Sequence, residues 1–304
     1  MQVKILGSAA GGGFPQWNCA CPNCHAVRGG QFRGKPRSQT QVAVSADGDS
    51  WFLLGASPDL RSQIESSPEL HPRSGTRSSP IQGVVLASAD LDHVIGLLLM
   101  RELQAFCVYA AESVINILRA NSMFGMLNRI ADQVQWQPMR AGEQFALNSN
   151  TGNSPPIRCQ AVAVSSHYPA YAQQVQKSAE AVMGLILTSA SGATMGFFPQ
   201  VAQLTTELKT VFAKLDCLLL DGTFWSDDEL IRLQGSRQRA REMGHIPVGG
   251  HDGTLREMAE SGKNRKMYIH INNTNPMLNE ASEEYRAVHA AGWELAEDGC
   301  HFTL

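Results

Sequence analysis

Hydrophobic and polar positions alternate along this chain in short, well-bounded segments. Short apolar runs rich in β-branched and aromatic residues, bounded by Gly, Pro, Ser or Asn, are typical of strands. They predict strands over residues 3–6, 41–45, 51–54, 84–87, 106–109, 157–164, 184–188, 194–198, 217–220 and 266–269. Longer stretches predict helices over residues 93–104, 199–213, 227–243 and 252–261. This order of elements predicts an α/β (α+β) fold in which two β-sheets are flanked by helices.

Two polar segments separate these elements without dividing the chain into domains. Residues 66–80 and 141–156 are rich in Ser, Gly, Asn and Pro, so we expect exposed loops that are too short to form domains. The sequence contains neither an internal repeat nor a low-complexity tail. We therefore predict a single domain over residues 1–304.

Composition narrows the class of protein. The chain has 304 residues, 43% of them hydrophobic, and a formal net charge of -3, which predicts a large core and argues against a nucleic-acid partner. No apolar stretch approaches the roughly 18 to 20 residues that span a bilayer, and the first residues lead into glycines without a cleavage pattern. We expect a cytoplasmic protein without a membrane partner. Its seven cysteines, an odd number, favour free thiols over a disulfide framework.

A polar turn follows the strand predicted at residues 84–87. Asp90, Asp92 and His93 place two carboxylates and an imidazole where this strand runs into an apolar helix, on an edge that the helix should make rigid. His270 ends another predicted strand and begins a polar loop, which is typical of a site residue. We predict a metal site whose candidate ligands are Asp90, Asp92, His93 and His270.

Three thiols lie within six residues of one another. Cys19, Cys21 and Cys24 form a Cys-rich loop over residues 19–24, and three thiolates on a tight turn can converge on one Zn²⁺ ion. We predict a structural zinc site, with three unrelated loop cysteines or a cytosolic redox pair as the alternatives. Three thiolates leave one ligand missing, and the candidates for it are His25, Asn273 and His301.

Four segments together resemble a known family. Residues 6–24, 89–93, 220–225 and 270–276 look like the corresponding segments of the PqqB family of pyrroloquinoline quinone (PQQ) biosynthesis, and the match covers nearly the whole chain. That family belongs to the metallo-β-lactamase-like group. The resemblance therefore implies a four-layer αββα sandwich with a metal site at one edge between the sheets. It also implies that the chain processes a Glu-Tyr-derived intermediate cut from a precursor peptide, with other PQQ biosynthesis proteins or a second copy of the chain as candidate partners.

The chain departs from the wider group at the metal ligands. The H-x-H-x-D-H motif of the group falls on residues 88–93, where Ser88 and Asp90 replace the two histidines of the first metal. The bridging Asp should fall near residues 197–200, which contain no carboxylate. The set that remains is Asp92, His93 and His270. Two imidazoles and one carboxylate with open positions favour Fe(II) and O₂ chemistry, although Zn²⁺ or another divalent metal can use the same ligands.

Four further residues are candidate catalytic groups. Asp221 ends a strand at a position where the family usually has an acid that orients an imidazole, here His245 or His251. These two histidines lie in a Gly-rich segment before a predicted helix, so we expect at least one of them to be functional. His167 aligns roughly with a further histidine of the lost first site, and a loop histidine bonded to the backbone is the alternative.

Three functions compete on this evidence. The favoured prediction is a mononuclear non-haem iron oxygenase that hydroxylates the tyrosine ring of a small peptide-derived substrate in PQQ biosynthesis. The second is a metal-dependent hydrolase, which the missing histidines and bridging carboxylate disfavour. The third is a non-enzymatic carrier of PQQ or an intermediate, for which a cluster of metal ligands is unnecessary.

Overall fold

The computed structural model describes residues 1–149, 155–172, 178–259, 262 and 264–304. These residues form two compact units. Unit 1 comprises Met1–Gly7, Thr40–Thr194 and Gly299–Leu304, and unit 2 comprises Ser8–Gln39 and Met195–Asp298. Each unit is described by itself below, and the expectation of a single domain over residues 1–304 stays a prediction.

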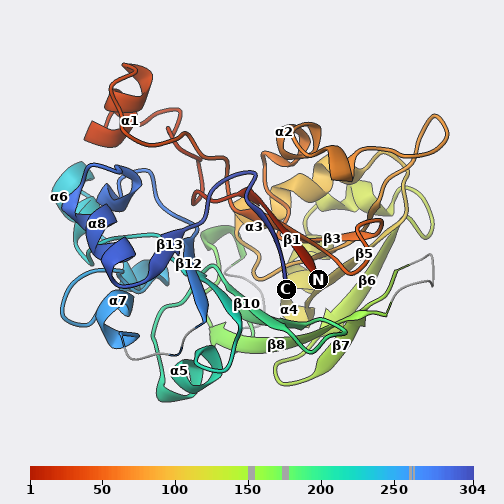
Figure 1. Ribbon diagram of the computed structural model, residues 1–304. Helices are drawn as coiled ribbons and strands as arrows, with labels where there is room; N and C mark the ends of the chain where they lie inside the picture. The colour runs from red at the N-terminus through yellow and green to blue at the C-terminus, as the bar shows by residue number, and fades with distance from the viewer. Residues whose placement is uncertain (150–154, 173–177, 260–261, 263) are drawn as a thin grey trace. The chain divides into compact units, whose positions relative to one another are not determined.

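Unit 1 contains a seven-stranded sheet with the order β14-β1-β2-β3-β4-β5-β6 (Figure 1). Strands β14, β1, β2 and β3 pair in antiparallel fashion, whereas β3 to β6 are parallel. Every residue of β2 and β3 is buried, as expected for strands covered on both faces. The strands are β1 (Gln2–Gly7), β2 (Gln41–Ser45), β3 (Trp51–Leu54), β4 (Ile81–Val85), β5 (Phe106–Ala111), β6 (Val134–Met139) and β14 (His301–Thr303).

Three antiparallel strands complete the β-structure of unit 1: β7 (Gln144–Leu147), β8 (Ile157–Ser165) and β9 (Val182–Thr188). The prediction of a loop over residues 141–156 is therefore wrong at β7. Alternate apolar residues of β7 pair with β8, Phe145 with Cys159 and Leu147 with Ile157, and this pairing stabilises a strand in a polar context. Residues 150–154 of the predicted loop lie outside the described residues.

The helices of unit 1 are short. The helix predicted over residues 93–104 is instead α3 (Leu91–Val94) followed by the 3₁₀ helix η2 (Ile95–Met100). Gly96 lies against neighbouring backbone, since a Cβ there would be 2.3 Å from the Ser57 carbonyl oxygen, and this close approach anchors the segment. The other helical segments are α2 (Leu60–Glu65), η1 (Pro68–Leu70), α4 (Glu112–Ala120), η3 (Phe124–Asn128) and η4 (Ala170–Ala172).

Unit 2 is built on parallel strands. Strands β10 (Thr194–Phe198), β11 (Cys217–Asp221), β12 (Arg265–Ile269) and β13 (Trp293–Leu295) pair in parallel in that order. β11 is buried throughout, as is usual for a central parallel strand. Parallel strands end at one edge of their sheet, so the loops after β10, β11 and β12 meet there.

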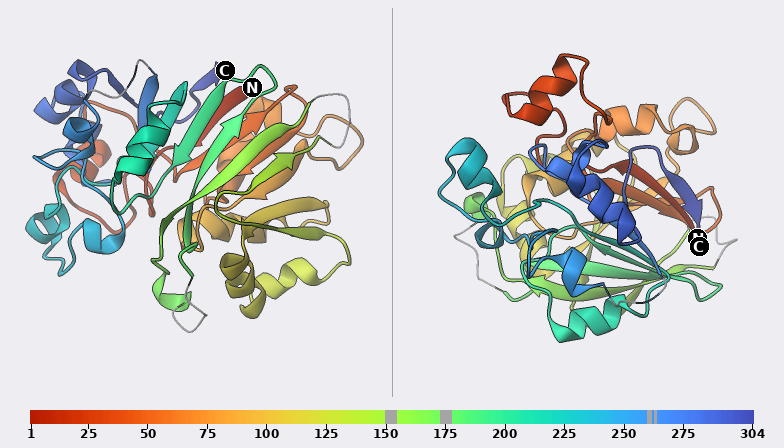
Figure 2. Two further views of the ribbon diagram at one scale, coloured as in Figure 1. Left: turned by 90° about the horizontal axis from the view of Figure 1, so that it is seen from below. Right: turned by 60° about the vertical axis from the view of Figure 1, so that its left-hand side comes forward.

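The helices of unit 2 are shorter than predicted. The helix expected over residues 227–243 is interrupted, because α6 (Glu229–Gln234) ends at Gly235, whose φ of 66° is left-handed. Residues 260 and 261 of the helix expected over residues 252–261 lie outside the described residues. Helix α8 packs beside β13 (Figure 2). The other helical segments are α1 (Pro22–Arg28), α5 (Thr206–Phe212), η5 (Arg241–Met243), α7 (Thr254–Glu257), η6 (Pro276–Leu278) and α8 (Glu283–Ala290).

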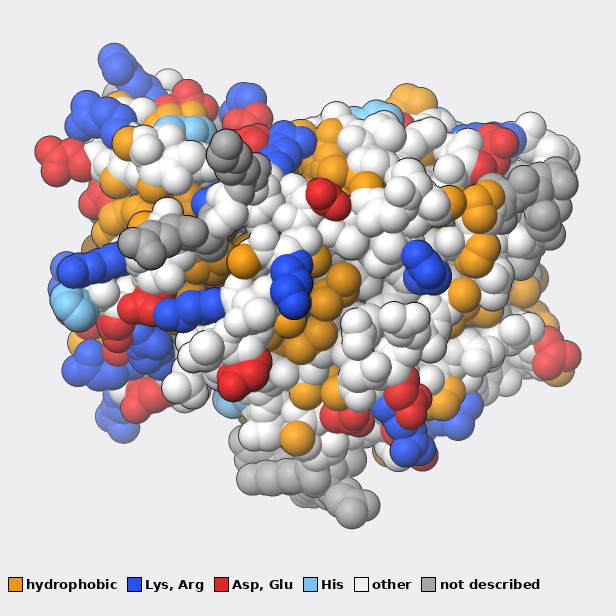
Figure 3. Space-filling view, turned by 60° about the horizontal axis from the view of Figure 1, so that its bottom comes forward, with side chains coloured by type: hydrophobic (Ala, Val, Ile, Leu, Met, Phe, Trp, Pro, Cys, Tyr) orange, Lys and Arg blue, Asp and Glu red, His pale blue; other side chains and the backbone are white. Residues whose placement is uncertain are grey.

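The surface carries charges of both signs. On the face drawn in Figure 3, Lys and Arg side chains are interspersed with Asp and Glu, in keeping with the small net charge. Within the described part of the chain, no helix combines the length and the apolar character needed to cross a membrane.

Candidate functional site

Asp221 and His270 meet at the edge where the parallel strands of unit 2 end. Asp221 is the last residue of β11 and lies opposite Ile269, the last residue of β12, so His270 follows directly beside it. The Gly222 N–H donates to the Ile269 carbonyl oxygen at 2.8 Å. A Cβ on Gly222 would lie 2.8 Å from the Cβ of Tyr268, so this close passage requires glycine. The Asp-Gly-Thr turn thereby brings Thr223 against His270.

The Asp221 carboxylate is fully buried and holds four hydrogen bonds. Its Oδ2 accepts from the Val201 N–H at 2.8 Å and contacts His245 Nδ1 at 2.9 Å. Its Oδ1 accepts from the Thr223 N–H at 3.0 Å and from the Thr223 hydroxyl at 2.6 Å. Because both oxygens are occupied, Asp221 is suited to orient an imidazole rather than to bind a metal itself. Its partner in the structure is His245, not His251.

Two imidazoles lie nearly parallel beside this carboxylate. The rings of His245 and His270 are 5.3 Å apart at an angle of 15°, and their Nδ1 atoms lie 3.0 and 2.9 Å from Thr223 Oγ1. His270 has a φ of 59°, a left-handed conformation that is uncommon for a residue with a side chain and often marks a functional position. Since both Nδ1 atoms face Thr223, the Nε2 atoms point away from it and are the nitrogens available to a metal or substrate.

A buried amide lies directly before Val201, whose N–H bonds the Asp221 carboxylate. Gln200 follows β10 in the segment where the group's bridging carboxylate is expected, and a Cβ on Gly244 would lie only 2.9 Å from Gln200 Nε2. Gln200 Oε1 is buried and has no hydrogen-bond partner among the described residues. An unsatisfied buried acceptor in the segment that bonds Asp221 through Val201 fits a site that a bound polar group or cation completes.

In unit 1, the polar turn brings Asp90, Asp92 and His93 together at the start of α3. His93 is buried, its N–H donates to the Asp90 carbonyl oxygen at 2.9 Å, and its Nε2 lies 3.9 Å from Asp92 Oδ2. Ser88 Oγ lies 2.7 Å from Asp90 Oδ2 and 3.1 Å from His93 Nδ1. The Tyr171 hydroxyl donates to the Ala89 carbonyl oxygen, and burial together with the charge of Asp90 raises the pKa of Tyr171 to about 12. Hydrogen bonds from Ser88, His93 and Tyr171 therefore fix the conformation of this turn.

The other two candidate catalytic histidines are exposed. His251 lies in the turn before α7, and His167 follows β8 with its backbone N–H donating to Ser165 Oγ at 3.1 Å. Among the described residues, the hydrogen-bond partners of the Asp221 carboxylate are Val201, Thr223 and His245. Their catalytic roles stay predictions.

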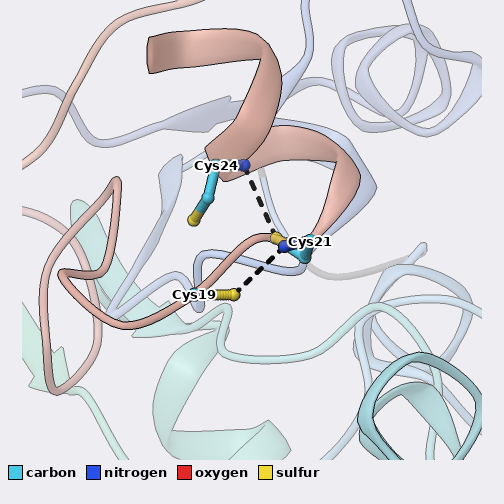
Figure 4. A group of neighbouring side chains, drawn as sticks. All are labelled: Cys19, Cys21 and Cys24. Atoms are coloured by element: carbon cyan, nitrogen blue, oxygen red, sulfur yellow. Dashed lines mark hydrogen bonds between the residues drawn. The ribbon is translucent and has the colours of Figure 1, made fainter.

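The thiol cluster lies at the start of α1 (Figure 4). The sulfur atoms of Cys19, Cys21 and Cys24 lie within 4.8 Å of one another. The Cys21 N–H donates to Cys19 Sγ at 3.4 Å and the Cys24 N–H to Cys21 Sγ at 3.5 Å. Burial raises the pKa of the Cys21 thiol to about 12, so nearby positive charge is needed to hold this group as a thiolate. This donor set fits Zn²⁺.

Asn273 contacts all three sulfurs. Its side-chain amide lies 3.1 Å from Cys19 Sγ, 3.6 Å from Cys21 Sγ and 3.3 Å from Cys24 Sγ. The oxygen and nitrogen of such an amide can exchange places by a simple flip, so the oxygen can face the cluster equally well. Of the other candidates for the fourth ligand, His25 is exposed on α1 and His301 lies on β14 of unit 1.

Sequence reasoning missed Thr223, Ser88 and Gln200. A hydroxyl or an amide has no spacing signal of its own, and only its distance from a carboxylate and an imidazole reveals its role. The one available clue was position, because Thr223 follows a strand-terminal acid by two residues and Ser88 precedes Asp90 by two.

Comparisons with known proteins show which family the chain resembles. Residues 50–271 match the beta-lactamase superfamily domain. Coenzyme PQQ synthesis protein B of Methylobacterium sp. (strain 4-46) is 40% identical over 100% of both chains, and that of Gluconobacter oxydans (strain 621H) is 41% identical over 100% of this chain and 99% of the relative. The crystal structure of Zn²⁺-bound PqqB from Methylobacterium extorquens has a TM-score of 0.91 and 38% identity, with 100% of both chains covered. A diphosphatase from the PhnP family, 19% identical with a TM-score of 0.68 over 100% of this chain and 97% of its own, shares the fold.

These matches confirm the predicted metallo-β-lactamase fold of the α/β class, and they confirm the resemblance that the sequence motifs indicate. The chain therefore belongs to the PqqB family of the beta-lactamase superfamily.

Proposed function

We propose that this protein catalyses a metal-dependent oxidative step of PQQ biosynthesis, the hydroxylation of the tyrosine ring of a small Glu-Tyr-derived intermediate. Full-length identity of 40% to proteins named for coenzyme PQQ synthesis supports the pathway, and the Zn²⁺-bound relative supports a metal. Other PQQ biosynthesis proteins, which supply the intermediate or take up the product, are the partners expected of such a step.

The observation that carries the proposal is the cluster of Asp221, Thr223, His245 and His270. It holds two imidazoles by Nδ1 at a buried sheet edge and leaves Nε2 of each for chemistry. A hydrolase of this superfamily would use a bridging carboxylate, and the buried amide of Gln200 lies in the segment expected to provide it. A carrier has no need of an imidazole oriented by a buried carboxylate.

The proposed ligands of the active-site metal are those predicted from the sequence: His93 and His270 through Nε2, and Asp92, with Asp90 as an additional carboxylate. Two histidines and one carboxylate favour Fe(II), which when bound supplies the redox chemistry that activates O₂. The chain's own groups orient the ligands and move protons. His245, held at Nδ1 by Asp221, is the proposed residue that exchanges a proton at Nε2 with the substrate.

The second metal site proposed is structural. Cys19, Cys21 and Cys24 provide three thiolates, and the Asn273 side chain is the proposed fourth ligand because it already lies at all three sulfurs. A zinc ion there would neutralise the Cys21 thiolate, which burial disfavours.

A metal exchange tests the function. Protein prepared without oxygen is loaded with Fe(II) or with Zn(II), and dissolved oxygen and product mass are followed with a free Glu-Tyr dipeptide. Ascorbate is added as the reductant, because hydroxylation by O₂ requires two electrons and two protons to reduce the second oxygen atom to water. We expect substrate-dependent oxygen consumption and a gain of oxygen with Fe(II) alone, and loss of both in His93→Ala and His270→Ala. Cleavage of the dipeptide by the zinc form would identify a hydrolase. Tight quinone binding without turnover under either metal would identify a carrier.

A further inference from the structure

We propose that Thr223 is a positioning residue whose hydroxyl fixes the proton of the His270 imidazole on Nδ1, so that Nε2 keeps the lone pair that a metal requires. The use of Nε2 for a metal rests on the proposed function. The position of the proton does not, and it can be measured in protein without active-site metal.

The Thr223 hydroxyl contacts four polar atoms. Asp221 Oδ1 lies at 2.6 Å and the His270 carbonyl oxygen at 2.9 Å, and both can only accept a hydrogen. His270 Nδ1 lies at 2.9 Å and His245 Nδ1 at 3.0 Å. A hydroxyl has one hydrogen to donate and two lone pairs that accept. Its hydrogen is therefore directed to an oxygen, most directly to the carboxylate at 2.6 Å, and its lone pairs face the two imidazoles.

The imidazole nitrogens that face these lone pairs must carry hydrogen. A neutral imidazole has one N–H, so a proton on Nδ1 leaves Nε2 as the acceptor nitrogen. For His245 the same assignment follows independently, because Nδ1 also lies 2.9 Å from Asp221 Oδ2, which can only accept. For His270 the nearby acceptor is Thr223 Oγ1. Asp221 thus orients His245 directly, and it orients His270 through the Thr223 hydroxyl.

The same arrangement recurs in unit 1. Ser88 Oγ lies 2.7 Å from the acceptor Asp90 Oδ2 and 3.1 Å from His93 Nδ1. The hydroxyl hydrogen again goes to the carboxylate, and the imidazole again donates from Nδ1. At both histidines that the proposed function assigns to the metal, a hydroxyl therefore lies between a carboxylate and Nδ1 of the imidazole.

The test is the proton position of His270, read by long-range ¹H–¹⁵N NMR of ¹⁵N-histidine-labelled protein from which active-site metal has been removed. His245→Gln and His270→Gln assign the signals. We expect both residues to show a protonated Nδ1 and an unprotonated Nε2. Thr223→Val, which keeps the shape but removes the hydroxyl, should give His270 a mixture of the two tautomers while His245 keeps its proton on Nδ1, and Thr223→Ser should restore the original spectrum.

One control variant and one further measurement distinguish positioning from general loss of structure. Thr210→Val removes a hydroxyl that bonds the Thr206 carbonyl oxygen on the exposed face of α5, and it should leave both histidine spectra unchanged. Thr223→Val should also lower active-site metal affinity about 10- to 100-fold, the usual effect of losing a residue that orients a ligand. A wild-type His270 protonated on Nε2 would overturn the proposal even if Thr223→Val fails to fold, as would an unchanged His270 spectrum in a folded Thr223→Val. Failure of metal-dependent turnover with the expected tautomers would contradict the proposed function alone.

Discussion

The thiol cluster and the imidazole cluster of unit 2 are assembled in opposite ways. Cys19, Cys21 and Cys24 are close in sequence, and one tight turn before α1 brings their sulfurs together. Asp221 ends β11, His245 follows η5 and His270 follows β12, and the parallel pairing of β11 with β12 places Asp221 and His270 at one edge. A site built from neighbouring residues can be recognised from their spacing in the sequence. A site built at a sheet edge can be recognised only from the order of strands and helices.

One loop connects the two clusters. His270 belongs to the imidazole cluster and Asn273, three residues later, contacts the thiols. The Asn23 side chain, on α1, donates to the carbonyl oxygens of Asn273 and Asn275 at 3.1 and 3.0 Å. Thr274 Oγ1 donates to Glu229 Oε1 at 2.5 Å. We therefore expect the thiol cluster to support the loop from which the His270 imidazole projects.

The largest expected effect is at the thiol cluster. Cys21→Ser should release the structural zinc and lower the free energy of unfolding by several kcal/mol, because metal binding and folding are coupled. Zinc content and denaturant unfolding measure it. Cys107→Ser, at a half-buried thiol of β5 in unit 1, is the matched control and should keep the metal. A Cys21→Ser protein with unchanged zinc and stability would contradict a structural role.

The next effect is a pH dependence of the unfolding free energy that arises at Glu229. This residue accepts a hydrogen bond from Thr274, in the loop that contains His270 and Asn273. Burial raises the pKa of Glu229 to about 7 from an ordinary value of 4.5. Between these values the folded protein keeps a proton that the unfolded chain has lost, so stability is higher at acidic pH and falls as pH rises through 7. At 1.36 kcal/mol per pKa unit, the loss between pH 5 and pH 8 should be roughly 2 to 3 kcal/mol.

Glu229→Gln removes this titration, so the difference in unfolding free energy between pH 5 and pH 8 should shrink by that amount. Chemical denaturation at the two pH values measures it. Glu283→Gln, at an exposed carboxyl in the first turn of α8, should keep the wild-type dependence. An identical dependence in Glu229→Gln would show that the buried carboxyl does not titrate in this range.

The smallest effect concerns Asn273. Asn273→Ala removes the amide from the three sulfurs and should cost about 1 to 3 kcal/mol of unfolding free energy, the range for disrupting a buried hydrogen-bond group. It should also speed zinc transfer to a chelator and perturb the His270 NMR signals. Asn272→Ala, whose amide contacts Thr274 instead, should retain the zinc. Unchanged His270 signals would mean that the two clusters are independent.

The sequence predicted what is local and missed what depends on packing. Strands β2, β3 and β10 have the predicted bounds because their apolar runs are sharply delimited. The sequence predicts a loop at strand β7 because polar residues surround it. Its alternation of apolar and polar residues stabilises a strand only when β8 pairs with it. The predicted helix over residues 227–243 ends early at a left-handed glycine.

The residues of the candidate site likewise fall into those that the sequence predicts and those that depend on packing. Asp221 and His270 could be predicted because they lie at the ends of predicted strands. The three cysteines could be predicted from their spacing, and neither prediction requires knowledge of packing. The sequence predicts either His245 or His251 as the partner of Asp221, because His245 lies 24 positions after Asp221, beyond a stretch of loop and helix. Thr223 could not be ranked among the other hydroxyl residues until its contacts with a carboxylate and two imidazoles were known.

The most direct test of the proposed hydroxylation is the origin of the new oxygen. Fe(II)-loaded protein, a free Glu-Tyr dipeptide and ascorbate as the two-electron reductant are incubated once under ¹⁸O₂ in ordinary water and once under ordinary O₂ in H₂¹⁸O, and the product is analysed by mass spectrometry. We predict that the heavy isotope enters the tyrosine ring from ¹⁸O₂ and that His270→Ala abolishes this incorporation. Heavy oxygen found only at a cleaved peptide carboxyl, and derived from water, would contradict the oxidative function and identify a hydrolase.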